Sequence, residues 1–264
     1  LALIGPRSVR VYANRRDHGF APAREVPHDE DSLPIPGNHR SELVALTDLL
    51  GSGQQHLVRI RHNEVRLWPN LGHGRFGRGM HLASLPFTYE EFDASRVLLA
   101  DLDGSGAVDL IYLCSEHALV FMNRSGVGFE PPFEQPWPAG VRYDALCQVS
   151  AADLLGLGCA SLVLTVPHMA PRHWRLDFVT DKPYLMTLSR NNMGAQSTLR
   201  YRSSAQEWLD EKNELQRDGT QPVCQMPLAL HLVNRQQQRD EITGNQLTQL
   251  FSYRLGHYLS LIHI

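Results

Sequence analysis

The sequence is short of the features that would assign it to several common functional classes. Its 264 residues include only four cysteines, and no two of them form a C-x-x-C pair, which speaks against a zinc site or a thioredoxin-like motif. Basic and acidic residues nearly balance, with 25 Lys and Arg against 28 Asp and Glu, so the basic excess typical of nucleic-acid binders is missing. No apolar run approaches the length of a membrane span.

Motifs of common enzyme classes are missing as well. The glycines of residues 72–77 (GHGRFG) do not have the spacing of a phosphate-binding G-x-x-x-x-G-K-[ST] loop. Ser203 and Ser204 are not surrounded by the G-x-S-x-G elbow of a hydrolase nucleophile. We therefore expect no catalytic residue in this chain and no enzymatic activity.

The two ends of the sequence lack the features of natural termini. The first residue is Leu1 rather than Met, and no basic-then-apolar signal pattern follows it. The last residues, 259–264 (LSLIHI), form an apolar run without a polar tail. We interpret the chain as an internal piece of a longer protein and leave open whether residues 259–264 are native.

An internal repeat organises the first two thirds of the chain. Three segments share one frame, in which an apolar strand leads into Asp, a Gly-x-Gly turn and a second apolar strand. The segments are residues 43–60, 97–113 and 148–165. Their leading aspartates, Asp48, Asp101 and Asp153, are separated by steps of 53 and 52 residues.

A second element, an Asn followed six residues later by a Phe, keeps a similar step. The pairs are Asn14 and Phe20, Asn70 and Phe76, and Asn123 and Phe129. Each pair flanks a turn that contains glycine and suits a hairpin. Short strands that recur at a constant step, about four in 50 residues, favour the blades of a β-propeller. The sequence thus predicts an all-β fold, with a partial β-propeller over residues 1–180 and a repeat period of about 53.

The second of the three loops, residues 101–110 (DLDGSGAVDL), is a candidate calcium site. Oxygen-bearing side chains stand at positions 1, 3, 5 and 9 of the loop: Asp101, Asp103, Ser105 and Asp109. Calcium prefers six to eight such hard ligands. Position 12 is Tyr112 rather than the bidentate Glu of an EF-hand, and a strand-like run follows instead of a helix. The order of residues resembles the loop of FG-GAP/VCBS repeats, which build β-propellers and in some members hold calcium.

The sister loops favour a simpler alternative. They keep the leading Asp and the later Gly, as Asp48 with Gly53 and Asp153 with Gly158, but they lose the other carboxylates. A leading Asp can accept backbone N–H groups and hold the turn without an ion. We therefore expect no required cofactor and leave calcium open for the Asp101 loop alone.

After about residue 180 the repeat stops, and a different β-rich segment begins. Residues 182–202 read as two strands around the turn RNNMG, in which Asn192 and Gly194 suit positive φ. A helix follows, with Ser203 or Ser204 as its N-cap and Glu207 completing a capping box with Ser204. We expect Trp208 and Leu209 to pack inward. The last part reads as strands separated by the turn ITGN.

This segment resembles a known family. The run Asn191-Asn192-Met193-Gly194-Ala195, the motif YRSSAQ at 201–206 and the stretch RDEITGNQLTQLFSYRLGHY at 239–258 look like the middle region of the B component of bacterial Tc-type insecticidal toxin complexes. In that family an FG-GAP/VCBS-type propeller lies just before this stretch, which is the order found here. The family pattern continues into a long Rhs-type β shell, and residues 259–264 do not fit it.

The resemblance implies a secreted, non-catalytic subunit. Residues 181–264 would be the truncated start of the β shell, which the B component forms with the toxic C component around the toxin. The propeller would dock on the pore-forming A component and gate the passage of the toxin. The charge balance and the short apolar runs lead us to expect no nucleic-acid partner and no direct membrane insertion. The alternative is a ligand- or carbohydrate-binding propeller of a secreted enzyme or adhesin.

Overall fold

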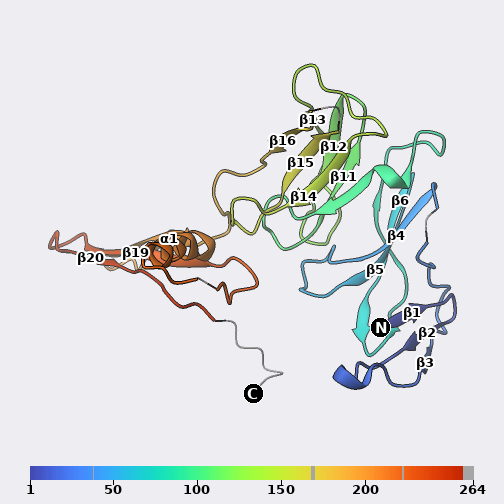
Figure 1. Ribbon diagram of the computed structural model, residues 1–264, viewed down its shortest axis with the longest axis horizontal. Helices are drawn as coiled ribbons and strands as arrows, with labels where there is room; N and C mark the ends of the chain where they lie inside the picture. The colour runs from blue at the N-terminus through green and yellow to red at the C-terminus, as the bar shows by residue number, and fades with distance from the viewer. Residues whose placement is uncertain (38, 168–169, 222, 258–264) are drawn as a thin grey trace. The chain divides into compact units, whose positions relative to one another are not determined.

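The computed structural model of the chain describes residues 1–37, 39–167, 170–221 and 223–257 (Figure 1). The described residues form antiparallel sheets and one α-helix, as the all-β prediction requires. They divide into two compact units, one within residues 1–150 and 163–174 and the other within residues 151–162 and 175–257. The expected strands are confirmed at this coarse level, whereas the closure of the sheets into a propeller stays a prediction.

Similar small sheets recur along the first part of the chain. The first sheet contains β1 (Ala2–Ile4), β2 (Ser8–Val11) and β3 (Arg24–Pro27). The second contains β4 (Glu42–Thr47), β5 (His56–Arg61), β6 (Glu64–Trp68) and β9 (Met80–Ser84), beside the small hairpin of β7 (Asn70–Gly72) and β8 (Arg75–Phe76). The third contains β10 (Val97–Ala100), β11 (Asp109–Leu113), β12 (His117–Phe121) and β13 (Phe133–Pro136). The fourth contains β14 (Gln148–Ala152), β15 (Ser161–Val166) and β16 (Arg172–Leu176), whose residues are shared between the two units.

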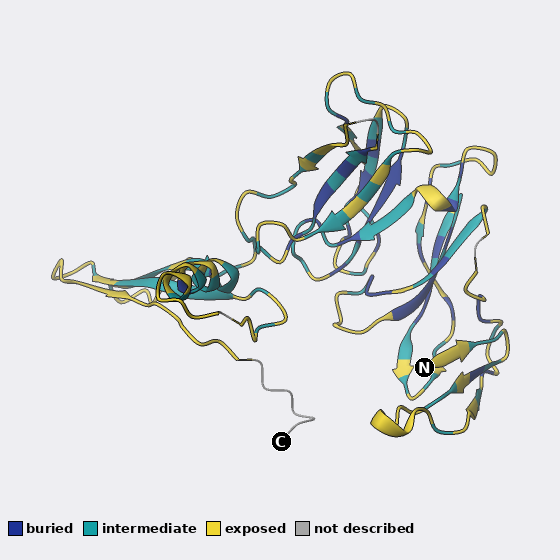
Figure 2. Cartoon of the chain, in the orientation of Figure 1, coloured by how far each residue is buried: buried dark blue, intermediate teal, exposed yellow. Residues whose placement is uncertain are grey.

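A core in the first unit is built from the inner strands of the second and third sheets. Figure 2 shows dark-blue, buried residues concentrated on these strands. The fully buried members include Val58 and Ile60 of β5, Leu67 of β6 and Leu110 of β11. Apolar residues alternate with less buried ones along β6, which is the period of a half-buried strand, whereas β11 is buried throughout. Because one cluster joins residues of both sheets, the two sheets share a single core.

The second unit holds a longer sheet and the α-helix. The sheet contains β17 (Leu188–Arg190), β18 (Ala195–Ser203), β19 (His231–Asp240) and β20 (Gln246–Leu250) in that order. The predicted turn between β17 and β18 is confirmed, since Asn192 has φ 58° and Gly194 has φ 91°. The turn ITGN joins β19 and β20, as the sequence indicates.

The helix α1 (Ser204–Arg217) corrects two details of the sequence-based prediction. Its N-cap is Ser203, whose side chain accepts the N–H of Ala205, so no capping box joins Ser204 to Glu207. The Ser204 hydroxyl instead accepts the N–H of Leu230, and this contact with the following loop decides between the two serines. Leu209 is 47% exposed and does not pack inward. Among the described helices, none has the length and apolar character that crossing a membrane requires.

Carboxylates of α1 fasten the chain that follows β20. Glu207 accepts the N–H of Tyr253 at 3.2 Å, and Glu211 accepts the N–H of Leu255 at the same distance. Residues four apart lie on one face of a helix, so both carboxylates face the segment that follows β20. Glu211 is the buried residue of the helix.

Candidate functional site

The Asp101 loop connects β10 to β11 and holds its own shape through its carboxylates. Asp101 accepts the N–H groups of Gly104 at 2.7 Å and Gly106 at 2.9 Å. Asp103 accepts the N–H of Ser105 at 2.9 Å, and the Ser105 hydroxyl lies 3.4 Å from the carbonyl oxygen of Ala107. The loop is therefore folded by short-range hydrogen bonds between its acidic side chains and its own backbone.

Asp109, the first residue of β11, is the most deeply buried of the predicted ligands, with 0% exposure. Its two oxygens accept the N–H of Leu102 at 2.8 Å and the N–H of Asn123 at 2.7 Å. Burial raises the pKa of Asp109 to about 6, although both hydrogen bonds lower it. Asp103 and Asp101 add to the rise because their charges repel a further negative charge.

The structure brings the three predicted carboxylates together. Asp101, Asp103 and Asp109 each place an oxygen within 4.8 Å of the others. The pKa of Asp101 is also raised, chiefly by burial. Three oxygens of this kind fit the ligand preference of calcium. Tyr112 contributes nothing to such a site, since its hydroxyl donates to the carbonyl oxygen of Glu91 at 2.8 Å.

The sister loops show what the leading Asp does where the other carboxylates are absent. Asp48 accepts the N–H groups of Ser52 at 3.1 Å and Gly53 at 2.5 Å. Asp153 accepts the N–H of Gly158 at 2.7 Å. The leading Asp thus ties the turn to the preceding strand in all three loops, which is the role that needs no ion.

The residue at position 9 of each loop forms a hydrogen bond to a residue 14 or 16 positions later, and the sequence did not predict these bonds. The residues are His56, Asp109 and Ser161, and they are 3%, 0% and 4% exposed. His56 Nδ1 accepts the N–H of Asn70 at 3.0 Å, as Asp109 accepts that of Asn123. Ser161 donates to Asp177 at 2.7 Å. The partners Asn70, Asn123 and Asp177 are separated by nearly constant steps in the sequence, and this regularity could have predicted the hydrogen bonds.

Ser52, His56 and Asp48 resemble a hydrolase triad in composition but not in function. Ser52 Oγ lies 2.9 Å from His56 Nε2. Because Nδ1 accepts the N–H of Asn70, the neutral imidazole carries its proton on Nε2 and donates it to Ser52. The histidine therefore has no free nitrogen with which to deprotonate the serine, and the cluster is structural.

The Asn–Phe pairs of the sequence are paired in the structure. Asn70 faces Phe76 in the β7–β8 hairpin, and bridges join Asn14 to Phe20 and Asn123 to Phe129. The Asn123 amide also donates to Val108 O at 2.8 Å and to Leu49 O at 2.9 Å. Since Leu49 belongs to the loop of the second sheet, this amide fastens the third sheet to the second.

Comparison with known proteins identifies the family. Residues 123–260 match the family described as "Insecticide toxin TcdB middle/N-terminal region", which is more than half of the chain. A comparison with curated proteins gives no match.

Solved structures extend the likeness to nearly the whole chain. A chain of the Photorhabdus luminescens Tc holotoxin pore is 48% identical over 97% of this chain, with a TM-score of 0.90. Chains in two crystal structures of TcdB2–TccC3, one of them with Cdc42, are 45% and 46% identical over 97% of this chain, with TM-scores of 0.80 and 0.81. In each case this chain spans 12% of the longer chain that it matches. The protein therefore belongs to the insecticide toxin TcdB family, the B component of Tc-type toxin complexes.

Proposed function

We propose that the protein acts as a non-catalytic part of a secreted insecticidal toxin complex. Residues 1–180 form a propeller that docks on a pore-forming A component and gates the passage of a toxin. Residues 181–264 begin the shell that encloses the toxin together with a toxic C component. The observation that carries this proposal is the 48% identity and TM-score of 0.90 to a chain of the Tc holotoxin pore. The matched TcdB2 structures hold TccC3, which supports a C-type partner.

The recurring sheets supply the docking surface in this proposal. We infer that the sheets of residues 1–180 are blades of a β-propeller, because equivalent loops repeat the same hydrogen bonds. The Asp loops and the Asn–Phe turns lie at one end of the sheets, since His56 links Asn70 and Asp109 links Asn123. The connections between successive sheets leave from the other end. Loops on a rigid scaffold commonly carry binding, so one of these ends meets the A component.

Binding of the full-length protein to the A component tests the proposal. Interferometry would measure how tightly the A component binds the unchanged protein and a double variant. The double variant carries Leu71→Asp and Val127→Asp at the end with the Asn–Phe turns. Leu146→Asp at the other end serves as the matched variant, since all three side chains are exposed. Docking through one end predicts about tenfold weaker binding for the variant of that end alone.

Absence of binding by the unchanged protein would contradict the proposed docking. Equal binding by both variants would contradict docking through the loop ends. Co-purification with the C component tests the shell separately, because neither variant changes the second unit.

A further inference from the structure

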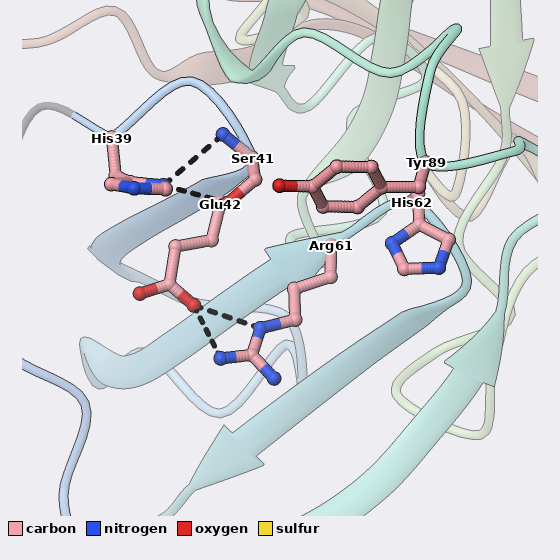
Figure 3. Close-up of a pocket in the computed structure, with 6 residues that line it drawn as sticks. All are labelled: His39, Ser41, Glu42, Arg61, His62 and Tyr89. Carbon is pink, nitrogen blue, oxygen red and sulfur yellow. Dashed lines mark hydrogen bonds and ion pairs between the residues drawn. The ribbon is translucent and has the colours of Figure 1, made fainter.

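A polar pocket in the first unit is separate from the Asp101 loop. Its volume is about 290 Å³, and it lies where the start of β4, the end of β5 and the loop after β9 meet. Figure 3 shows the six side chains that line it: His39, Ser41, Glu42, Arg61, His62 and Tyr89. The volume lies near the lower end of small-ligand pockets, about 300 Å³, and suits a ligand of one ring.

A cross-strand ion pair provides both a donor and an acceptor in the pocket. Glu42 and Arg61 face each other in the register of β4 and β5. Arg61 Nε and Nη2 both contact Glu42 Oε2, at 2.8 and 2.7 Å. In Figure 3 the other carboxylate oxygen carries no contact with the residues drawn. Among the residues drawn, Oε1 and the remaining guanidinium nitrogen have no partner, so they can accept from and donate to hydroxyl groups of a ligand.

Tyr89 supplies an aromatic wall. Its side chain is 66% exposed, which is unusual for a large ring. The ring forms a T-shaped pair with His62, with the two ring centroids 5.7 Å apart. Figure 3 shows the phenol hydroxyl pointing toward Ser41. His39 lies beside Ser41. The N–H and the hydroxyl of Ser41 both donate to Nδ1 of His39. The neutral imidazole of His39 thus keeps its proton on Nε2, as a further donor.

The wall is held in place before any ligand arrives. Thr88 and Glu91 close the turn around Tyr89, with the Thr88 hydroxyl donating to Glu91 at 2.7 Å. Phe92, just beyond this turn, is buried in the core. The N–H of Phe87 binds the carbonyl oxygen of His62 at 3.3 Å, which fixes the loop to the end of β5. A preformed site loses less entropy on binding than a flexible one.

The chemistry of the lining selects the class of ligand. Its one carboxylate and one guanidinium are paired with each other, which disfavours a strongly charged ligand such as a phosphate. It contains no aliphatic side chain, which disfavours a lipid. A ring that offers hydroxyl groups on its edge and C–H groups on its face fits both the ion pair and the tyrosine. We propose that this pocket binds a neutral pyranose sugar.

Saturation-transfer NMR on the full chain tests the proposal. The probes are the methyl pyranosides of glucose, galactose and mannose, with inorganic phosphate as the charged comparison. We expect saturation transfer from the protein to at least one of the three sugars, which indicates binding, with a dissociation constant on the order of 1 mM. Tyr89→Ala should weaken this binding by about tenfold, because it removes the stacking face. Glu42→Gln should weaken it as well, since the amide accepts fewer hydrogen bonds.

Tyr184→Ala, which removes an exposed ring of the second unit, is the matched control and should bind like the unchanged chain. Thermal melting of each variant shows whether a loss of binding reflects unfolding. The proposal is overturned if none of the sugars binds at about 20 mM, or if folded Tyr89→Ala binds as tightly as the unchanged chain. Binding of phosphate without binding of any sugar would overturn the ligand class.

Discussion

His56 accepts the main-chain N–H of Asn70 through Nδ1 at 3.0 Å, in the position where Asp109 accepts the N–H of Asn123 one repeat later. An imidazole and a carboxylate thus satisfy equivalent main-chain donors in neighbouring sheets. The requirement at this position is an acceptor that reaches across the sheet, and different side chains meet it.

Replacement of His56 by Leu is expected to destabilise the protein by about 2 kcal/mol, because it leaves the half-buried N–H of Asn70 without an acceptor. Chemical denaturation followed by tryptophan fluorescence measures the loss. The control is His18→Leu, which changes an exposed histidine and should have little effect. Equal stability of the two variants would show that the link through His56 is dispensable.

Stability should also depend on the ionisation of Asp109. Burial raises the pKa of this carboxyl from 3.8 to about 6, so the folded protein binds the proton more tightly than the unfolded chain does. The contribution of Asp109 to stability is therefore largest below about pH 4 and falls as the pH rises to about 6. Melting curves from pH 4 to 7 in a chelator should show this fall in the unchanged protein. The variant Asp109→Asn should not show this fall in melting temperature, because it has no carboxyl group to ionise at this position.

Calcium at neutral pH is expected to raise the melting temperature only slightly, by less than about 3 °C, because backbone N–H groups already satisfy much of the carboxylate cluster. The measurement compares calcium with a chelator, using magnesium as the control ion. A large rise that disappears in Asp103→Ala would instead establish a strong calcium site in the Asp101 loop.

Asp31 is expected to be important for attaching residues 28–33 to the second sheet. Its carboxylate accepts the indole N–H of Trp68 and the main-chain N–H of Gly79, each at 3.1 Å, and contacts His28 at 2.9 Å. Asp31→Ala leaves these donors unpaired and should cost about 2 to 3 kcal/mol. Urea denaturation measures the cost, and Asp29→Ala at an exposed neighbour is the control. A loss of similar size in both variants would argue against this role.

Much of the local structure could be predicted from the sequence because it depends on short-range patterns. The Gly-rich turns, the Asn–Phe pairs and the hairpin at Asn192 follow from the steps between residues and from the need for positive φ. The proximity of Asp101, Asp103 and Asp109 follows from the loop that contains them. Propeller closure, the boundary near residue 180 and calcium binding stay predictions.

The parts that were missed depend on contacts between distant segments. The sequence left the N-cap open between Ser203 and Ser204, because the choice depends on the contact of Ser204 with Leu230, which no local motif contains. The roles of His56 and Ser161 were hidden because neither resembles Asp109 chemically. The pocket takes residues from three segments, so its members, among them His39, Arg61 and Tyr89, form no motif.

The amide of Asn123 has a consequence for how the chain acquires its structure. Because it supplies the donor for Leu49 O, the loop of the second sheet is complete only after the third sheet has formed. During synthesis from the N-terminus, the second sheet would therefore wait about one repeat before it reaches its final stability. A chain that stalls within this interval would expose an unsatisfied carbonyl group and an open strand edge, both of which chaperones and other nascent chains can bind.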